Sequence, residues 1–275
     1  MRRPPDSSGP RPSRLAVIAD VHGNLPALEA VLDDLARRGG ADLLVDLGDL
    51  VSGPLWPAQT LQRLRSLPVR TIRGNHDRLV ATLAPADMDS WDRFAFAALG
   101  DEERRWLGGL PPRLEPAPGV LACHGTPADD LTYLVETIRD GALGRDRPDG
   151  IFRRLIGSGD AGVILCGHSH RQDFVRLPDG RAIVNPGSVG CPAYADDTAP
   201  AHRSESGTPH ARYARLELDG ATCRTVELLA VAYDWERAAA RAESGGRADW
   251  AHALRTGVMP PLGHARELAS GDDDK

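Results

Sequence analysis

The stretch Ile72-Arg73-Gly74-Asn75-His76-Asp77 is the one from which the rest of this chain can be interpreted. It places an asparagine and a histidine side by side on a glycine turn, directly after the apolar segment 69–72. A glycine followed by an asparagine is also ordinary turn chemistry, so this stretch by itself predicts little. Its meaning depends on the segments that precede and follow it.

Four other segments also place polar side chains directly after apolar runs. They are Asp20-Val21-His22, Gly48-Asp49, His124-Gly125 and Gly167-His168-Ser169-His170. Each of the apolar runs is typical of a buried strand. The five segments therefore bring carboxylate, amide and imidazole groups to strand ends that can meet at one end of one sheet.

Strands and helices alternate through the first part of the chain. We predict strands over residues 15–19, 42–47 and 69–72, and helices over residues 25–38 and 57–67. Asn24 can cap the first helix, and Gly39-Gly40 ends it. Alternating strands and helices favour an α/β sheet, in which sites form outside the carboxyl ends of the strands.

The remainder of the chain is predicted to change from helices to strands and back. Helices are expected over residues 89–99, 101–107, 151–156, 234–243 and 247–254, and strands over residues 119–123 and 163–166. Two hairpins are expected, one around Pro178-Asp179-Gly180 and one around Asp219-Gly220.

Composition divides the chain into three parts. Residues 1–13 are rich in Pro, Ser and Arg and are expected to be disordered. Residues 14–230 form the main domain, in which 126–147 should be a loop covering part of the site and 195–210 a flexible polar insertion. Residues 231–275 add an acidic tail and a helical extension, which either packs on the sheet or mediates self-association.

Overall composition indicates a soluble globular protein. The 275 residues are 41% hydrophobic and 26% charged, and the formal net charge of -6 argues against general nucleic-acid binding. The 4 cysteines are scattered without metal-site or redox spacing, which favours free thiols in a reducing compartment. No apolar run approaches the length of a membrane span, and Arg2-Arg3 precede prolines rather than an apolar run. We therefore expect a cytoplasmic protein without a secretory signal.

The polar residues at the strand ends match the ligands of metal ions that act on phosphate esters. Such ions are usually held by carboxylate oxygens and imidazole nitrogens. Two ions roughly 3.5–4 Å apart need a bridging ligand, which a carboxylate can supply. Asp20 and His22 can turn to the same ion, whereas His168 and His170 can divide between two. Cys123 and Cys166 lie inside the strands and are expected in the core.

Each motif also has an ordinary structural explanation. Asp-x-His is common by chance, Gly48-Asp49 can be a turn, His124 can be a strand terminus, and Gly-His-Ser-His can be a polar loop. All five occur in one chain, each after a predicted strand. Their combination favours a site for two metal ions.

In their order, these motifs resemble those of the calcineurin-like metallophosphoesterase superfamily. The resemblance covers roughly residues 15–229 and is closest to the small bacterial phosphodiesterase branch, given Ile18-Ala19-Asp20-Val21-His22-Gly23-Asn24 and Asn185-Pro186-Gly187-Ser188. It implies that residues 14–230 form a metallophosphoesterase domain. The implied fold is α/β, a four-layered α/β/β/α sandwich of two mixed sheets flanked by helices.

The resemblance also implies roles for individual residues. One metal ion would be held by Asp20, His22, Asp49 and His170, and the other by Asp49, Asn75, His124 and His168, so that Asp49 bridges. His76 would be the catalytic residue beside the leaving group. Asp77 either orients the His76 ring or caps the following segment. The stretch 185–188 either supports the site or is a plain turn.

The implied activity is hydrolysis of a phosphate ester by a hydroxide that two divalent metal ions activate. Mn²⁺ or Fe is expected first, and Zn²⁺ or Ni²⁺ next. We expect a small phosphodiester or nucleotide as substrate, with a phosphatase acting on a small metabolite or phosphoprotein as the alternative. A non-catalytic scaffold, as in a retromer subunit of this superfamily, is less favoured because every ligand position is filled. Nucleic acid and membrane partners are not expected, and a homo-oligomer is left open.

Overall fold

The strand β1, Arg14–Ile18, lies in the middle of the first sheet and is buried on both faces. Leu15 and Val17 pack in the core between two sheets, whereas Ala16 and Ile18 pack in the core beneath the helices. Burial on both faces explains the uninterrupted apolar sequence of this strand. In this computed structural model, residues 14–261 are described. Segment 1–13 and the tail after Ser270, predicted to be disordered and loose, lie outside that range.

The first sheet has the strand order β14-β13-β1-β2-β3. β1, β2 (Leu43–Asp46) and β3 (Val69–Thr71) are parallel, whereas β13 (Ala211–Asp219) and β14 (Thr222–Val231) form an antiparallel hairpin beside β1. Because the three parallel strands end at one edge, their following loops meet there. The hairpin predicted around Asp219-Gly220 is confirmed.

The second sheet has the order β4-β5-β8-β10-β9 and packs on the first. Its strands are β4 (Arg113–Ala117), β5 (Val120–Cys123), β8 (Val163–Leu165), β9 (Gln172–Arg176) and β10 (Ala182–Pro186). The central strands β5, β8 and β10 are parallel, and β4 and β9 pair antiparallel at the two edges. The hairpin predicted around Pro178-Asp179-Gly180 is the β9–β10 connection. β4 was not predicted.

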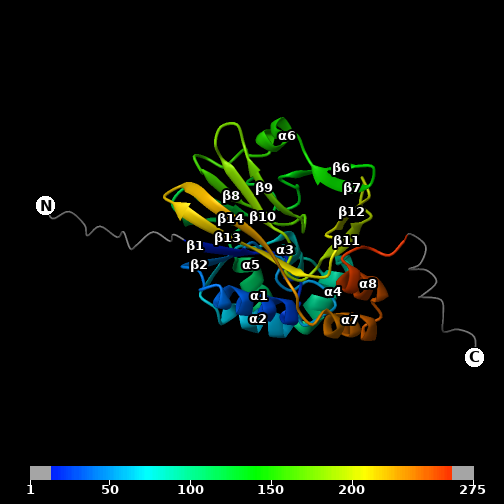
Figure 1. Cartoon of the computed structure of the whole chain (residues 1–275). Coiled ribbons are helices and arrows are strands. Elements are labelled where there is room, and N and C mark those ends of the chain that lie inside the picture. Colours follow the sequence, from blue (N-terminus) through cyan, green and yellow to red (C-terminus); the bar gives the residue numbers. More distant parts are fainter. Residues whose placement is uncertain (1–13, 262–275) are drawn as a thin grey trace, which may run out of the picture.

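Helices cover the outer faces of both sheets (Figure 1). The described helices are α1 (Leu25–Arg37), α2 (Pro57–Arg65), α3 (Asn75–Thr82), α4 (Ser90–Ala98), α5 (Asp101–Gly109), α6 (Pro148–Arg153), α7 (Trp235–Ser244) and α8 (Ala248–Thr256), with a short 3₁₀ turn at Pro85–Asp87. α1 begins where predicted, because the Asn24 side chain accepts a hydrogen bond from the amide of Ala27. The layers run from α1 and α2 through the two sheets to α6, which confirms the predicted α/β/β/α order.

A third sheet departs from the prediction of two. It has the order β11-β12-β7-β6 and consists of β6 (Glu136–Arg139), β7 (Ala142–Arg145), β11 (Ala193–Asp196) and β12 (His202–Glu205). The prediction that residues 195–210 form a flexible insertion is therefore wrong. The buried side chains of β12 are polar, His202 and Ser204, and both make hydrogen bonds. Polar residues with such partners can be buried in a strand.

Smaller differences concern the neighbouring segments. Residues 126–147 were predicted to form one loop, but only their first half does so, and the second half is the β6–β7 hairpin. The helix predicted over residues 151–156 is α6, which begins earlier at Pro148. All four cysteines are free, as predicted, and buried, which was predicted for Cys123 and Cys166. None of the helices within residues 14–261 has the length and apolar character needed to cross a membrane.

Candidate metal centre

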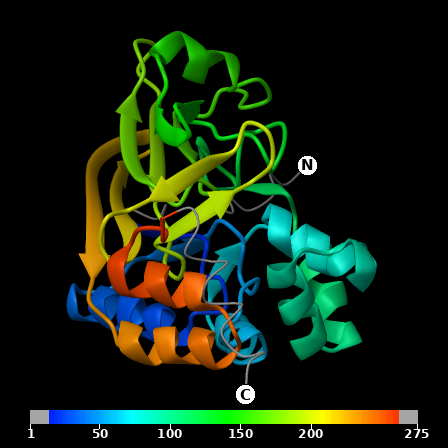
Figure 2. The ribbon, with the colours of Figure 1, turned by 90° about the vertical axis from the view of Figure 1, so that its right-hand side faces the viewer.

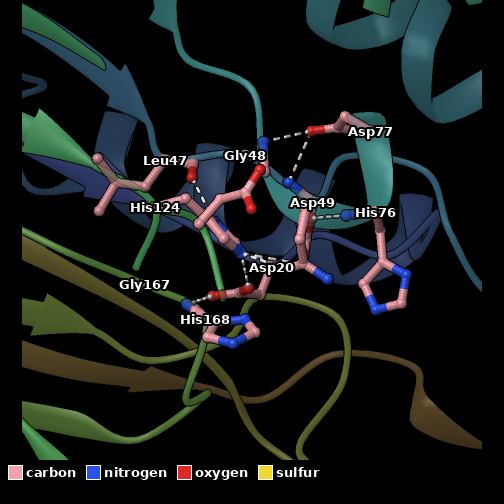
Figure 3. A network of polar contacts seen from close by, with 12 residues as sticks. Asp20, Leu47, Gly48, Asp49, His76, Asp77, His124, Gly167 and His168 are labelled. Carbon is pink, nitrogen blue, oxygen red and sulfur yellow. Dashed lines mark hydrogen bonds and ion pairs between the residues drawn. The ribbon is translucent and has the colours of Figure 1, made fainter. Parts of the chain in front are cut away.

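The predicted metal ligands lie at the carboxyl ends of strands in both sheets. Asp20 and His22 follow β1, Asp49 follows β2, Asn75 begins α3 after β3, His124 follows β5, and His168 and His170 follow β8. Figure 3 shows side chains from both sheets converging on one point. The site therefore exists only where the two sheets meet.

Five of these residues have left-handed backbone conformations. The φ angles are 55° at Asp20, 48° at His22, 59° at Asp49, 66° at His168 and 59° at His170. A residue with a β-carbon in this region is strained and persists only when the surroundings hold it, which is typical of functional sites. Backbone hydrogen bonds from Asp20 to Gly48 (2.9 Å) and from His22 to Asp49 (3.0 Å) hold the first two loops together.

The side chains form two clusters with the chemistry of metal sites. Asp20, His22 and His170 make one cluster, and Asp49, His124 and His168 make the other, with the candidate ligand atoms of each cluster within 4.8 Å of one another. Asn75 joins the second cluster through its Oδ1 atom, 3.0 Å from Nε2 of His124. The two clusters divide the predicted ligands as the resemblance implied, except that Asp49, expected to serve both ions, is grouped with the second cluster alone.

Backbone carbonyl groups fix the orientation of the four imidazole rings. Nδ1 of His22, His124 and His170 lies 2.7 Å, 2.7 Å and 2.8 Å from the carbonyl oxygens of Ser52, Leu47 and Cys191. Nε2 of His168 lies 2.9 Å from the carbonyl oxygen of Leu131. A carbonyl can only accept, so each of these nitrogens carries the proton and donates. The second nitrogen of each ring remains available to a metal ion, the usual arrangement around metal-binding histidines.

The arrangement of lone pairs in the first cluster fits a cation. Nε2 of His22 lies 3.1 Å from Nε2 of His170, and both rings already donate through Nδ1. Oδ1 of Asp20 lies 3.4 Å from Nε2 of His170, is buried and has no hydrogen-bond donor. Two nitrogen lone pairs and a carboxylate oxygen that face one another repel unless a positive charge lies between them. The residues present therefore fit a divalent metal ion.

The carboxylates impose a positive charge on the site. Burial lowers the pKa of His124, but Asp49, with Oδ2 3.1 Å from Nε2, outweighs it and raises the pKa to about 9. Asp20 likewise overcomes burial and raises the pKa of His170 well above its ordinary value. Burial and the neighbouring rings lower the pKa of His22 to about 3 and that of His168 to about 4. A cation, whether it is a proton or a metal ion, is therefore stabilised beside each carboxylate.

Asp77 caps α3 and does not orient His76. Its carboxylate accepts hydrogen bonds from the amides of Asp49 (2.8 Å), Leu50 (3.0 Å) and Gly74 (3.0 Å) (Figure 3). Of the two alternatives left open by the sequence, the capping role is the one observed. Asp77 thereby ties the loop that carries Asp49 to the start of α3.

The ring of His76 points away from Asp49 and His124 (Figure 3) and contacts two residues that the sequence did not indicate. Its Nδ1 atom lies 2.8 Å from Oδ1 of Asp92, and its ring stacks on Trp91 with centroids 5.8 Å apart. Burial lowers its pKa, but Asp49 and Asp92 raise it more, to about 10. Asp92 also accepts a short hydrogen bond from Ser52, so the pair is anchored.

The stretch Asn185-Pro186-Gly187-Ser188, which is the end of β10 and the two residues after it, supports the site. The Asn185 amide donates to the carbonyl of Gly167 (3.0 Å) and to Oγ of Ser169 (3.0 Å), which lies between His168 and His170. The Ser188 hydroxyl donates to the carbonyl of Asp20 (2.7 Å). These bonds hold ligand-bearing loops of both sheets in place.

A cavity of about 800 Å³ opens beside the two clusters. Its walls include Asn75, His76, His168 and His170 on one side, and Tyr133, Tyr194 and His202 of the third sheet and its loops on the other. Tyr133 joins the other two through its hydroxyl, which lies 2.8 Å from both the Tyr194 hydroxyl and Nε2 of His202. The sequence did not indicate these three residues, because no motif connects them.

Two packed sheets with outer helices, and buried Asp and His clusters at the strand ends, define the class of metallophosphoesterases. Within that class, the chain belongs to the calcineurin-like phosphoesterase family, whose model matches residues 13–172. Family membership and the two clusters together support a metal-dependent phosphohydrolase. The superfamily implied by the sequence motifs is thus confirmed.

Several proteins are similar to this chain. A metallophosphoesterase from Sphaerobacter thermophilus has a TM-score of 0.68 and 25% identity, covering 90% of this chain and 100% of its own. A hypothetical protein from Pyrococcus horikoshii has the same TM-score with 21% identity, over 90% of this chain and 99% of its own, and shows the fold alone. An uncharacterised protein of Methanocaldococcus jannaschii is 29% identical over 205 residues, 66% of this chain and 77% of its own.

Proposed function

We propose that the protein hydrolyses a phosphodiester or nucleotide-type substrate with the help of two divalent metal ions. The observation that carries this proposal is the first of the two clusters, in which Nε2 of His22 faces Nε2 of His170 at 3.1 Å and Oδ1 of Asp20 is buried without a hydrogen-bond donor. Asp49, which belongs to the second cluster, is proposed as the ligand that bridges both ions. Mn²⁺ or Fe suits the oxygen and nitrogen donors best, and Zn²⁺ or Ni²⁺ comes next.

The chain's own residues would position the reacting groups. When bound, the metal ions would lower the pKa of water and neutralise charge on the phosphoryl oxygens. Asp20, Asp49, Asn75 and the four histidines hold the ions. His76 is held through Nδ1 by Asp92 and lines the cavity, so that its Nε2 would donate a proton to the leaving oxygen.

The test compares three substrates on protein supplied with Mn²⁺: a bis-nitrophenyl phosphate diester, a nitrophenyl phosphate monoester and single-stranded DNA. We expect the diester to be hydrolysed fastest and all turnover to stop with EDTA. A matched pair of variants, Asp49→Asn in the site and Asp33→Asn on the exposed face of α1, separates site chemistry from general effects. Faster hydrolysis of the monoester would instead favour a phosphatase, and turnover after exhaustive chelation would exclude the metal mechanism.

The proposed bridge has its own test. Asp49→Asn weakens a ligand that both ions share, whereas His22→Ala removes a ligand of one ion only. Metal analysis of the purified variants should therefore show a larger loss for Asp49→Asn. Equal losses would mean that Asp49 does not bridge.

A further inference from the structure

The cavity beside the metal centre has few positive charges outside the metal site. Among the described residues that line it, the carboxylates away from the proposed ligands are Asp89, Glu136, Asp196 and Asp197. The basic side chain in its wall is Arg154, which donates to Asp146 (2.6 Å) and to the carbonyl of Leu134 (3.0 Å). The Arg154 guanidinium is therefore already engaged in an ion pair and a hydrogen bond within the protein.

Asp196 and Asp197 in the wall are not paired with a cation from the described residues, whereas Asp89 lies near His76, whose pKa is raised. Within residues 14–261, no ion pair involves Asp89, Asp196 or Asp197. Asp89 caps α4 and Asp196 accepts from Thr198, so hydrogen bonds hold both carboxylates where they are. A second anionic group of a substrate that lies beside Asp196 and Asp197 would meet these charges without a cation to pair with.

The uncharged part of the wall includes aromatic rings that are held in place. Trp91 stacks on His76, and Tyr133 stacks on His168 with ring centroids 4.7 Å apart. Tyr194 meets His170 edge to face, also at 4.7 Å, and shares a hydrogen bond with Tyr133. Fixed aromatic surfaces suit a flat, uncharged ring.

We propose that this cavity selects phosphate esters with a single phosphorus atom and an uncharged, ring-bearing organic group of nucleoside size, and rejects polyphosphate chains. The inference rests on the proposed function, because the single phosphoryl group is the one held at the metal centre. Organic groups of that size suit a cavity of about 800 Å³. Each further phosphate adds a negative charge that faces the carboxylates of the third sheet and of α4.

The expected discrimination follows from charge repulsion. At a separation of roughly 10 Å and an effective dielectric constant of about 20–80, each repulsive pair lowers affinity roughly two- to fifteenfold. Because exposed charges are screened, the discrimination should shrink when the salt concentration is raised. A purely steric preference would not respond to salt.

The test measures binding of thymidine 5′-monophosphate and thymidine 5′-triphosphate to the Mn²⁺-loaded protein by calorimetry, with free Mn²⁺ held constant. We expect the monophosphate to bind at least as tightly as the triphosphate. The double variant Asp196→Asn/Asp197→Asn should shift the ratio towards the triphosphate by roughly threefold or more. The double variant Asp33→Asn/Asp160→Asn, which removes the same charge from exposed positions outside the cavity, should leave the ratio unchanged.

Hydrolysis measured on the same samples distinguishes the two proposals. A nitrophenyl ester of thymidine monophosphate should be cleaved much faster than a dinucleoside tetraphosphate. If neither is cleaved but the binding ratio holds, the proposed function fails and this selectivity stands. Tighter binding of the triphosphate by tenfold, binding of neither nucleotide, or equal responses of the two double variants would each overturn the selectivity.

Discussion

At the scale of single residues, the two ring nitrogens of His76 have different surroundings. Nδ1 is held by Asp92, and the ring as a whole lines the cavity. We predict that His76→Asn retains its metal and binds substrate nearly normally, while kcat falls about 10²–10⁴-fold, the usual value of general acid catalysis. The loss should be smaller for a nitrophenolate leaving group, because that oxygen needs less protonation.

Metal analysis and kinetics on good and poor leaving groups check this prediction. His252→Asn, in α8 and outside the cavity wall, is the matched control. Loss of metal in proportion to loss of activity would make His76 a ligand. Full activity on a poor leaving group would make it a structural neighbour only.

Gly74 leaves room for the proposed bridging carboxylate. A β-carbon at this position would lie 2.1 Å from Oδ1 of Asp49 and 2.6 Å from its backbone nitrogen, and a backbone contact cannot be relieved by rotating a side chain. We predict that Gly74→Ala lowers metal content, melting temperature and kcat together. Gly109→Ala, where a β-carbon meets nothing within 4 Å, should change none of them. Normal metal binding by Gly74→Ala would show that a displacement of Asp49 does not weaken metal binding.

Glu136 makes stability depend on pH. The carboxyl is 3% exposed, and burial raises its pKa to about 7, although Ser169 donates to it at 2.8 Å. Between about pH 4.5 and 7 the unfolded chain releases this proton and the folded chain keeps it, so the free energy of unfolding falls as the pH rises. Above pH 7 the ionised Glu136 lowers the free energy of unfolding by a constant amount of about 3 kcal/mol.

Replacing the Glu136 carboxyl by an amide removes this loss of stability. We predict that Glu136→Gln raises the melting temperature by several degrees at pH 8 but changes it little at pH 5. Glu102→Gln, at an exposed position, should show no such difference between the two pH values. An equal effect of Glu136→Gln at both would mean that the carboxyl is ionised in the folded protein.

The sequence predicted the site residues that belong to short motifs. It did not predict those that are distant in sequence and come into contact only in the folded protein. Asp20 and His22, or His168 and His170, are two positions apart at a strand end, so local geometry brings them together. Asp92 lies 16 positions after His76, on another helix, and no local pattern connects the two. Such partners depend on how α3 and α4 pack, which a periodic pattern does not specify.

At the scale of elements, apolar patterns predicted the two main sheets but not the third. β1 and β8 are buried on both faces and therefore have continuous apolar sequences. β12 buries a histidine and a serine, whose polarity is satisfied by Tyr133 and by the carbonyl of Ser169. A strand stabilised by such hydrogen bonds has the composition of a loop, and this is why residues 195–210 were misjudged.

The two C-terminal helices, α7 and α8, lie side by side against the rest of the fold (Figure 2), and α8 contacts the metal centre through Trp250. Trp250 of α8 is 3% exposed and meets Trp91 (4.7 Å between centroids) and the ring of His22 (6.2 Å) edge to face. Its ring lies so close to Gly53 that a β-carbon there would be 2.8 Å away. The helices thus pack on the domain, the first of the two roles considered from the sequence.

Trp250 is therefore expected to position Trp91 and, through it, His76. Trp250→Ala should destabilise the fold by about 3–5 kcal/mol, so Trp250→Phe is the informative variant. We predict that Trp250→Phe lowers kcat on poor leaving groups by up to about 10²-fold with little change in KM, since small displacements of a catalytic group cost this much. Trp106→Phe in α5, whose neighbour is Arg65, should leave kcat unchanged. Equal kinetics of the two variants would reduce Trp250 to a packing residue.

At the scale of the whole molecule, each metal cluster joins the two main sheets. The first cluster takes Asp20 and His22 from the end of β1 and His170 from the end of β8. The second takes Asp49 from the first sheet and His124 and His168 from the second. A bound ion is therefore a further link between two sheets that also share an apolar core and hydrogen bonds between their loops.

Metal binding should consequently stabilise the entire fold. A ligand that binds only the folded state at 100 times its Kd adds about 2.7 kcal/mol to the free energy of unfolding. We predict nearly two ions per chain after purification without chelator, a single unfolding transition that moves to lower temperature with EDTA, and recovery with Mn²⁺. His22→Ala and His170→Ala remove ligands of the same ion from opposite sheets and should reduce the Mn²⁺-dependent shift to a similar extent. His252→Ala should keep the full shift. If only one of the two site variants loses the Mn²⁺-dependent shift, the ion is held by one sheet, and the metal centre does not link the two sheets.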